Sequence, residues 1–138
     1  YDKEGKGIVR TFAVPDVKMG QDKKPTLESL NKTLSVISEQ AGHGGRIEGA
    51  YIESDKFKEM KTYAESKIAE NSNPKRKEYS LRNNNCGTFA ADVLKQDPSV
   101  KDKAPVIIDS RPNSIVKEYQ NSFKSLNYDP KKRQVKIE

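Results

Sequence analysis

The sequence predicts an α+β domain, because two kinds of hydrophobic spacing occur along it. In several segments of ten or more residues, apolar side chains recur every three to four positions, as on a helix with one buried face. Shorter segments rich in β-branched residues have the composition and alternation of strands. The chain has 138 residues, enough to bury a hydrophobic core. We therefore expect residues 1–138 to form one domain.

The first half of the chain is predicted to hold two strands and two helices. Residues 1–7 have turn composition, and Thr26 and Ser54 or Asp55 are suitable helix caps. In order, we expect a strand at 8–14, a helix that Thr26 caps and that runs to about residue 40, a strand at 46–52, and a helix near 55–70. The inward residues are expected to be Leu27, Leu30, Leu34 and Ile37 in the first helix, and Phe57, Met60, Ala64 and Lys67 or Ile68 in the second.

The second half is predicted to hold two more helices and a final strand. One helix begins at Cys86 and ends near Gln96, before a loop that runs to Pro105. The last helix follows Ser114 and carries an apolar face through Leu126. Its inward residues are expected to be Ile115, Tyr119, Ser122, Phe123 and Leu126. Val135 and Ile137 alternate with polar residues, which indicates an edge strand.

The charge balance is basic, with a net charge of +6 and a pI near 9.3. Such a balance is compatible with an anionic partner such as nucleic acid. The two basic clusters, at residues 75–77 and 131–133, contain no aromatic side chains, and no nucleic-acid motif is present. A solvated surface is therefore the favoured interpretation. The sequence also has no membrane-spanning run and no signal-peptide core.

Cys86, the one cysteine, stands where a helix is predicted to begin. Three asparagines precede it, and Asn is a good N-cap because its side chain accepts a backbone hydrogen bond. Cys86, Phe89, Ala90, Val93 and Leu94 then have helical spacing. A helix N-terminus favours a thiolate and can hold an oxyanion. The alternative is that Cys86 is a small buried hydrophobic residue.

His43, the one histidine, is the candidate base for a Cys86 nucleophile. It lies between glycines, at Gly42-His43-Gly44-Gly45, so an ordinary loop histidine is the alternative interpretation. One Cys and one His provide too few ligands for a zinc site. No phosphate-binding glycine loop is present, so we expect neither a metal nor a cofactor.

Residues 78–94 resemble the cysteine-bearing helix of the circularly permuted branch of papain-like cysteine amidohydrolases. This NlpC-like branch includes lecithin–retinol acyltransferase-like proteins and C-terminal toxin or effector domains of bacterial polymorphic secretion systems. In it, a Tyr-x-Leu segment, here Tyr79 to Leu81, leads to Asn-Asn-Cys-x-x-Phe, here residues 84–89. Weaker similarities lie at residues 9–15, 51–57 and 111–114.

The resemblance implies an α+β papain-like fold, in which about four helices pack on a small antiparallel sheet. It implies that Cys86 is catalytic, with a histidine as its base, for which His43 is the candidate in this chain, and that Asn84, Asn85 and Thr88 bind substrate. The activity would be that of a peptidase, amidase, deamidase or acyltransferase acting on protein, peptidoglycan or lipid. The chain would be a toxin module of a larger protein, secreted or delivered into a target cell, with a cognate immunity protein as a further partner.

The position of the histidine departs from this pattern. In such domains the catalytic His usually sits on a strand that would lie before Tyr1. Three interpretations follow: the base lies upstream, His43 serves in a rearranged geometry, or the domain is inactive and only binds. A basic, nucleic-acid-targeting toxin is a further alternative.

Overall fold

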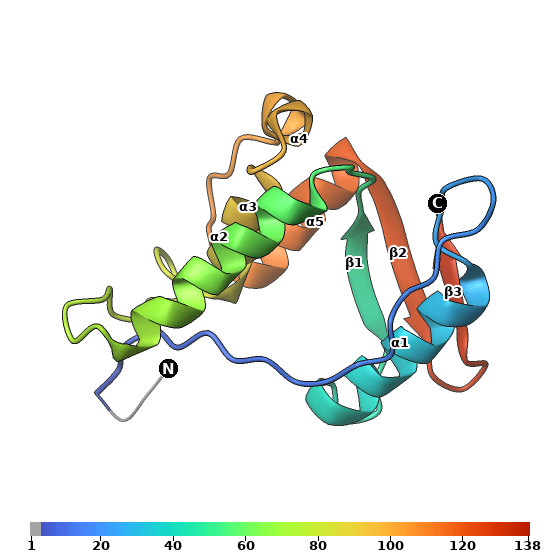
Figure 1. Cartoon of the computed structure of the whole chain (residues 1–138), viewed down its shortest axis with the longest axis horizontal. Coiled ribbons are helices and arrows are strands. Elements are labelled where there is room, and N and C mark those ends of the chain that lie inside the picture. The colour runs from blue at the N-terminus through green and yellow to red at the C-terminus, as the bar shows by residue number, and fades with distance from the viewer. Residues whose placement is uncertain (1–3) are drawn as a thin grey trace. The chain divides into compact units, whose positions relative to one another are not determined.

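The computed structural model describes residues 4–138 and confirms the α+β class (Figure 1). Its elements are α1 Leu27–Ala41, β1 Ile47–Tyr51, α2 Phe57–Ala69, the 3-10 helix η1 Glu70–Ser72, α3 Cys86–Leu94, α4 Pro98–Lys103, α5 Pro112–Ser122, β2 Lys124–Asp129 and β3 Gln134–Ile137. Part of the predicted turn at 1–7 lies outside the described residues. Contacts divide the chain into two compact units: residues up to 11 with 52–123, and residues 12–51 with 124–138.

The sheet unit contains three antiparallel strands in the order β1-β2-β3. Its core is formed by Leu34 of α1, Tyr128 of β2 and Val135 of β3, with Tyr128 only 1% exposed. The backbone N–H of Val135 donates to Asn31 Oδ1 at 2.9 Å, which links β3 to α1 by a hydrogen bond as well as by packing. The predicted strands at 46–52 and at the C-terminal tail are thus confirmed.

The end of the last helix was predicted wrongly. The helix ends at Ser122, and Phe123 has extended backbone angles (φ −130°, ψ −165°). Leu126 lies in β2 and pairs with Gly49 on one side and Ile137 on the other. Helical and alternating spacing overlap here, and the two neighbouring strands select the strand. Ile137, the partner on β3, lies beyond the segment whose spacing predicted the helix, so that local pattern could not reveal the pairing.

The strand predicted at residues 8–14 does not form. The side chain of Asn71 occupies the place that a paired strand would take beside Val9. Its Oδ1 accepts from the Val9 N–H at 2.9 Å, and its Nδ2 donates to the Val9 carbonyl at 2.7 Å. β-Branched residues form a strand only where a partner backbone is available to pair with them. Here the amide of Asn71 satisfies the N–H and carbonyl of Val9 alone, so no ladder of hydrogen bonds extends along the segment.

The helical unit contains α2, α3, α4 and α5. Its buried apolar residues include Ala91 of α3, Val100 of α4 and Ile115 and Tyr119 of α5. The short helix α4 lies where a loop was expected. The missed signals were Asp97, whose side chain caps the helix, and Pro98 at its first position. Most inward positions are correct, but Leu27 and Phe57 are 60% and 71% exposed, since each is the first residue of its helix.

Asp97 connects α4 to the segment before α2, and we predict that its contribution to stability depends on pH. The buried carboxylate accepts from Ser54 Oγ at 2.6 Å and from Ser99 N and Oγ at 2.9 and 2.8 Å. The hydrogen bond from Ser54, followed by that from Ser99, lowers the pKa of Asp97. This stabilisation is therefore complete above the unfolded-state value, near pH 4, and is lost as the pH falls through the lower folded-state value.

We expect Asp97→Asn to lower the thermal midpoint at pH 7 by about 3 °C. The difference from the unmodified chain should shrink below about pH 4, where protonation removes the same interaction. Circular dichroism melts from pH 2 to 8 test this, with the exposed Asp102→Asn on α4 as the control. A constant difference across that range would contradict the assignment.

Candidate active site

Cys86 is the first residue of α3, and its free thiol is exposed. The buried residues of α3 are Gly87 and Ala91, whereas Cys86 and Ala90 face solvent. The predicted inward face of this helix was thus wrong by about one position. The error has a physical cause: glycine permits the closest approach of another helix, and Gly87 is the residue that α5 covers. The interpretation of Cys86 as a buried structural residue is contradicted.

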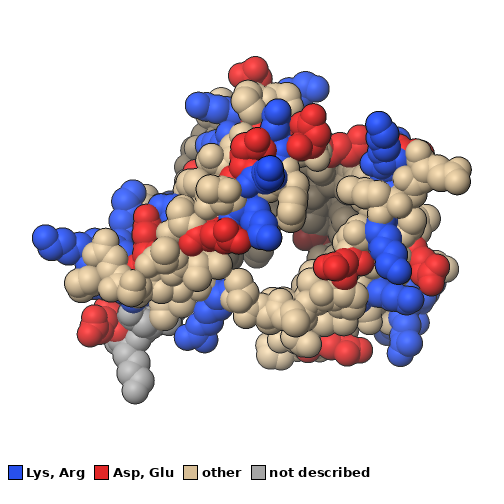
Figure 2. Space-filling model, viewed as in Figure 1, with Lys and Arg blue, Asp and Glu red and all other residues tan. Residues whose placement is uncertain are grey.

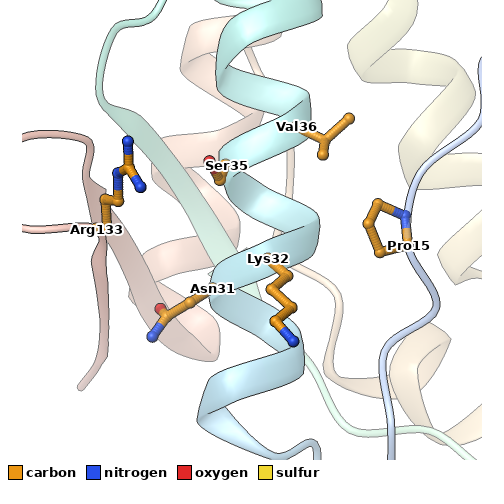
Figure 3. A pocket seen from close by; sticks show the side chains of 6 residues that line it. All are labelled: Pro15, Asn31, Lys32, Ser35, Val36 and Arg133. Carbon is orange, nitrogen blue, oxygen red and sulfur yellow. The ribbon is translucent and has the colours of Figure 1, made fainter.

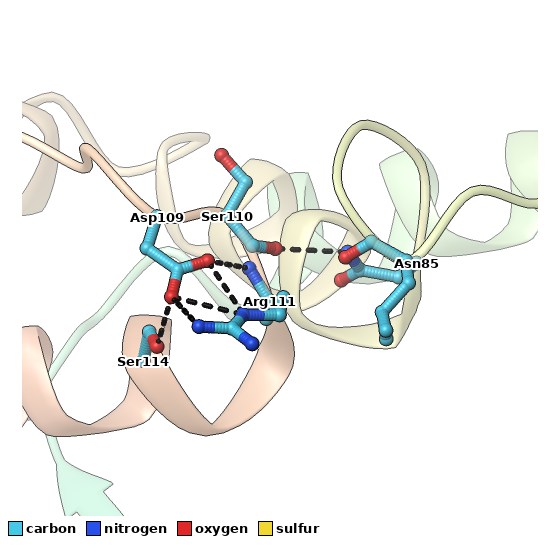
Figure 4. Close-up of polar contacts among 6 residues, drawn as sticks. Asn85, Asp109, Ser110, Arg111 and Ser114 are labelled. Carbon is cyan, nitrogen blue, oxygen red and sulfur yellow. Dashed lines mark hydrogen bonds and ion pairs between the residues drawn. The ribbon is translucent and has the colours of Figure 1, made fainter.

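Asn85 determines how α3 begins. Its side chain is 4% exposed. Oδ1 accepts from the N–H groups of Gly87 and Thr88 at 2.9 and 3.0 Å. Nδ2 donates to the carbonyls of Leu81 and Ser110, both at 2.8 Å (Figure 4). Both the oxygen and the nitrogen of this amide are therefore bonded within the chain, and Asn85 joins the loops at Leu81 and Ser110 to the first turn of α3.

Thr88 and Asn84 also support the segment that carries Cys86. Thr88 Oγ1 donates to the Asn85 carbonyl at 2.9 Å and accepts from the Asn85 N–H at 2.9 Å, which completes a capping box. Asn84 Nδ2 donates to the Glu78 carbonyl at 2.9 Å. Ser80 and Asn84 exchange two backbone hydrogen bonds, which close the loop. Substrate binding by Asn84, Asn85 and Thr88 stays a prediction.

The backbone N–H of Cys86 is the free donor in the first turn of α3. Asn85 occupies the next two N–H groups, and the N–H of Phe89 donates to the Asn85 carbonyl. Among the hydrogen bonds of residues 4–138, none uses the Cys86 N–H. The positive end of the helix dipole and this N–H can stabilise a thiolate or an oxyanion there.

Gly87 is packed tightly against the start of α5. A Cβ at this position would lie 2.8 Å from Pro112 Cα and 3.1 Å from Ile115 Cδ1. The first contact is with backbone, which cannot rotate away. Glycine therefore lets α3 and α5 approach one another directly behind Cys86.

An ion pair at residues 109–114 was missed by the sequence analysis. The Asp109 carboxylate accepts from Arg111 Nε at 3.0 Å, from Arg111 Nη2 at 2.6 Å and from Ser114 Oγ at 2.8 Å (Figure 4). The hydrogen bonds from Arg111, with that from Ser114, hold the pKa of Asp109 well below its usual range. The available signal was an Asp two residues before an Arg-Pro pair that opens a helix.

His43 lies in the other unit, in the turn after α1. It is exposed and has a positive φ of 53°. The Ser38 carbonyl accepts from the N–H groups on both sides of it, those of Gly42 and Gly44, at 3.0 and 2.8 Å. The turn therefore orders the backbone of His43. Cys86 belongs to the helical unit, and the pairing of the two side chains stays a prediction.

Hollows open on the surface of both units. Figure 3 shows the hollow of the sheet unit, where side chains of α1 lie between Pro15 and Arg133. The other follows α2 and is lined by Lys58, Glu59, Thr62, Tyr63, Ser66 and Gln96. Neither hollow is lined by Cys86 or His43. In residues 4–138 no three His, Cys, Asp or Glu side chains are grouped to hold a metal ion.

Comparison with known proteins gives two matches. Residues 1–102 match the family described as type VI secretion system effector TseH-like. The crystal structure of the type VI secretion system effector TseH superposes with a TM-score of 0.83 and 25% sequence identity, covering 99% of this chain and 75% of that chain. No curated protein sequence matches. No helix among the described residues has the length and apolar character needed to cross a membrane.

We predict that Asn85→Ala destabilises the chain by about 2 kcal/mol, because the cap is lost and two carbonyls lose a buried donor. Chemical denaturation measures the difference. Asn83→Ala is the matched control, because Asn83 belongs to the same run and is exposed. Equal stabilities of the two variants would contradict the role given to Asn85.

We also predict that Gly87→Ala destabilises the chain by about 2 kcal/mol through overpacking against Pro112. Gly49→Ala provides the control, since a Cβ there has no atom within 4 Å. The same denaturation experiment separates them: Gly49→Ala should stay within about 0.5 kcal/mol of the original chain. A neutral Gly87→Ala would show that α3 and α5 are not in tight contact.

Proposed function

Because the chain belongs to the TseH-like type VI secretion system effectors, which the secretion system delivers into target cells, we propose that it is a cysteine enzyme. Cys86 is the nucleophile, and the substrate bond is an amide or an ester in the target cell. The fold is proposed to be the permuted papain-like one, in which a cysteine opens a helix.

The observation that carries this proposal is the environment of Cys86. A structural cysteine is normally buried, whereas this thiol is exposed at the first position of a helix. The helix start is ordered by a capping box, and one N–H beside the thiol is free. These features favour the thiolate and supply an oxyanion donor at the same place.

The proposed reaction passes through an acyl-enzyme. A base, for which we propose His43, removes the Sγ proton, and the thiolate attacks the carbonyl carbon. The Cys86 N–H donates to the oxyanion. The carbon–nitrogen or carbon–oxygen bond then breaks, and the protonated base gives its proton to the leaving group. Water or another acceptor releases the acyl group from Sγ, so hydrolysis, deamidation and acyl transfer share the first half of this route.

The substrate is proposed to be protein, peptidoglycan or lipid, and a cognate immunity protein is the proposed partner. The nucleic-acid alternative has less support. Figure 2 shows Lys and Arg interspersed with Asp and Glu over the visible face. The inactive alternative has less support because an exposed thiol at a capped helix start serves no packing purpose.

The first test is the pH dependence of iodoacetamide labelling at Cys86. We expect labelling to persist well below pH 8, because the helix start favours the thiolate. In His43→Ala the rate at pH 7 should fall about tenfold if His43 is the base. Mass spectrometry locates the label, and the unfolded chain gives the reference rate for an unperturbed thiol.

Three outcomes are informative. Fast labelling that depends on His43 supports the Cys86–His43 dyad. Fast labelling that is indifferent to His43 supports Cys86 as the nucleophile and requires a base other than His43. Labelling no faster than in the unfolded chain would overturn the enzyme proposal. Loss of toxicity in a target cell on Cys86→Ser, with unchanged abundance, is the corresponding biological readout.

A further inference from the structure

The loop before α5 is connected to the nucleophile by hydrogen bonds. Its Ser110 carbonyl accepts from Asn85 Nδ2 at 2.8 Å. Asn85 precedes Cys86 directly and caps the helix that Cys86 opens. The position of the Ser110 carbonyl therefore affects the start of α3. The residues on both sides of Ser110 form the Asp109–Arg111 ion pair (Figure 4).

Asp109 fixes this carbonyl from two sides. Its Oδ1 accepts from the Arg111 backbone N–H at 3.1 Å, which closes a turn around Ser110. Its Oδ2 accepts from Arg111 Nη2 at 2.6 Å and from Ser114 Oγ at 2.8 Å. Ser114 lies in the first turn of α5, so the carboxylate joins the loop to that helix. Pro112 at the first position of α5 further restricts the backbone.

Asn85 has little freedom to compensate if this loop moves. Its side chain is 4% exposed, and a buried amide hydrogen without an acceptor is costly. The Leu81 carbonyl receives the other strong hydrogen bond of Nδ2. Displacement of the Ser110 carbonyl would therefore rotate or loosen the amide whose Oδ1 caps Gly87 and Thr88.

We propose that Asp109 is a positioning residue for Cys86: with Arg111 and Ser114 it holds the Ser110 carbonyl, which orients Asn85 and thereby the thiol at the start of α3. Asp109 acts through other residues and touches no reacting atom. The inference rests on the proposed function, because it concerns the reactivity of the same thiol.

The charge of Asp109 and its positioning role predict opposite effects on the thiol. Removal of a negative charge, which leaves Arg111 unneutralised, favours a nearby thiolate and would speed alkylation. If the positioning is lost, the start of α3 frays and stabilises the thiolate less, so alkylation would slow. The sign of the change therefore separates the two roles.

The test is the pH profile of iodoacetamide labelling at Cys86 in Asp109→Asn. We expect labelling at pH 7 about threefold slower, with the midpoint shifted upward. Arg111→Lys should have the same effect, since it keeps the charge and removes the planar fork. Ser114→Ala is the milder variant and should give a smaller slowing in the same direction. Asp129→Asn is the matched control, because Asp129 also accepts a turn N–H, from Lys131 at 2.9 Å, and lies 3.9 Å from an arginine, Arg46, in the sheet unit.

Slower labelling in the variants of Asp109, Arg111 and Ser114, with the control unchanged, supports the inference. If the original chain labels rapidly and folded Asp109→Asn labels at the same rate or faster, the positioning role of Asp109 is overturned. If Asp109→Asn fails to fold, Ser114→Ala decides by the same criterion. Slow labelling in the original chain is the separate result that would remove the proposed function itself.

Discussion

The hydrogen bonds of one buried amide, that of Asn85, are the constraint on which the candidate site depends. The side chain joins three stretches of chain: the loop at Leu81, the loop at Ser110 and the first turn of α3. These bonds satisfy backbone groups of all three stretches, and one of those groups, the N–H of Gly87, is buried. An aspartate would keep the cap and lose both donors, and a serine would be too short. The demand on this position is therefore for asparagine specifically.

The packing behind Cys86 also holds the start of α3 in place, through side chains of α5. Gly87 allows the backbone of α5 to lie against α3, and the buried Ile115 and Tyr119 hold α5 in the helical unit. Consequently the face of α3 that carries Cys86 is directed to solvent. A reactive side chain needs to be held in place and to be accessible to its substrate. A short helix that is tightly packed on one side and exposed on the other meets both needs.

Local signals predicted the start of α3 well and its orientation poorly. The asparagine run and the spacing after it identify the cap and the helix, since capping is a contact between near neighbours. The exposure of Cys86 depends on Pro112, 26 positions away by sequence number, which no local pattern contains. The same limit explains the missing strand at 8–14 and the strand found at Leu126. In both cases the deciding element is a partner distant in sequence.

Cys86 is the one cysteine among these 138 residues, and this has a consequence for its oxidation. An exposed free thiol such as that of Cys86 is accessible to oxidants. This sequence contains no second cysteine, so a sulfenic acid at Cys86 has no internal thiol with which to form a protective disulfide. Mixed disulfides with small thiols, or a disulfide between two copies, are then the reversible products, and further oxidation is permanent. The redox state of the compartment that receives the effector thus determines how long Cys86 stays a free thiol.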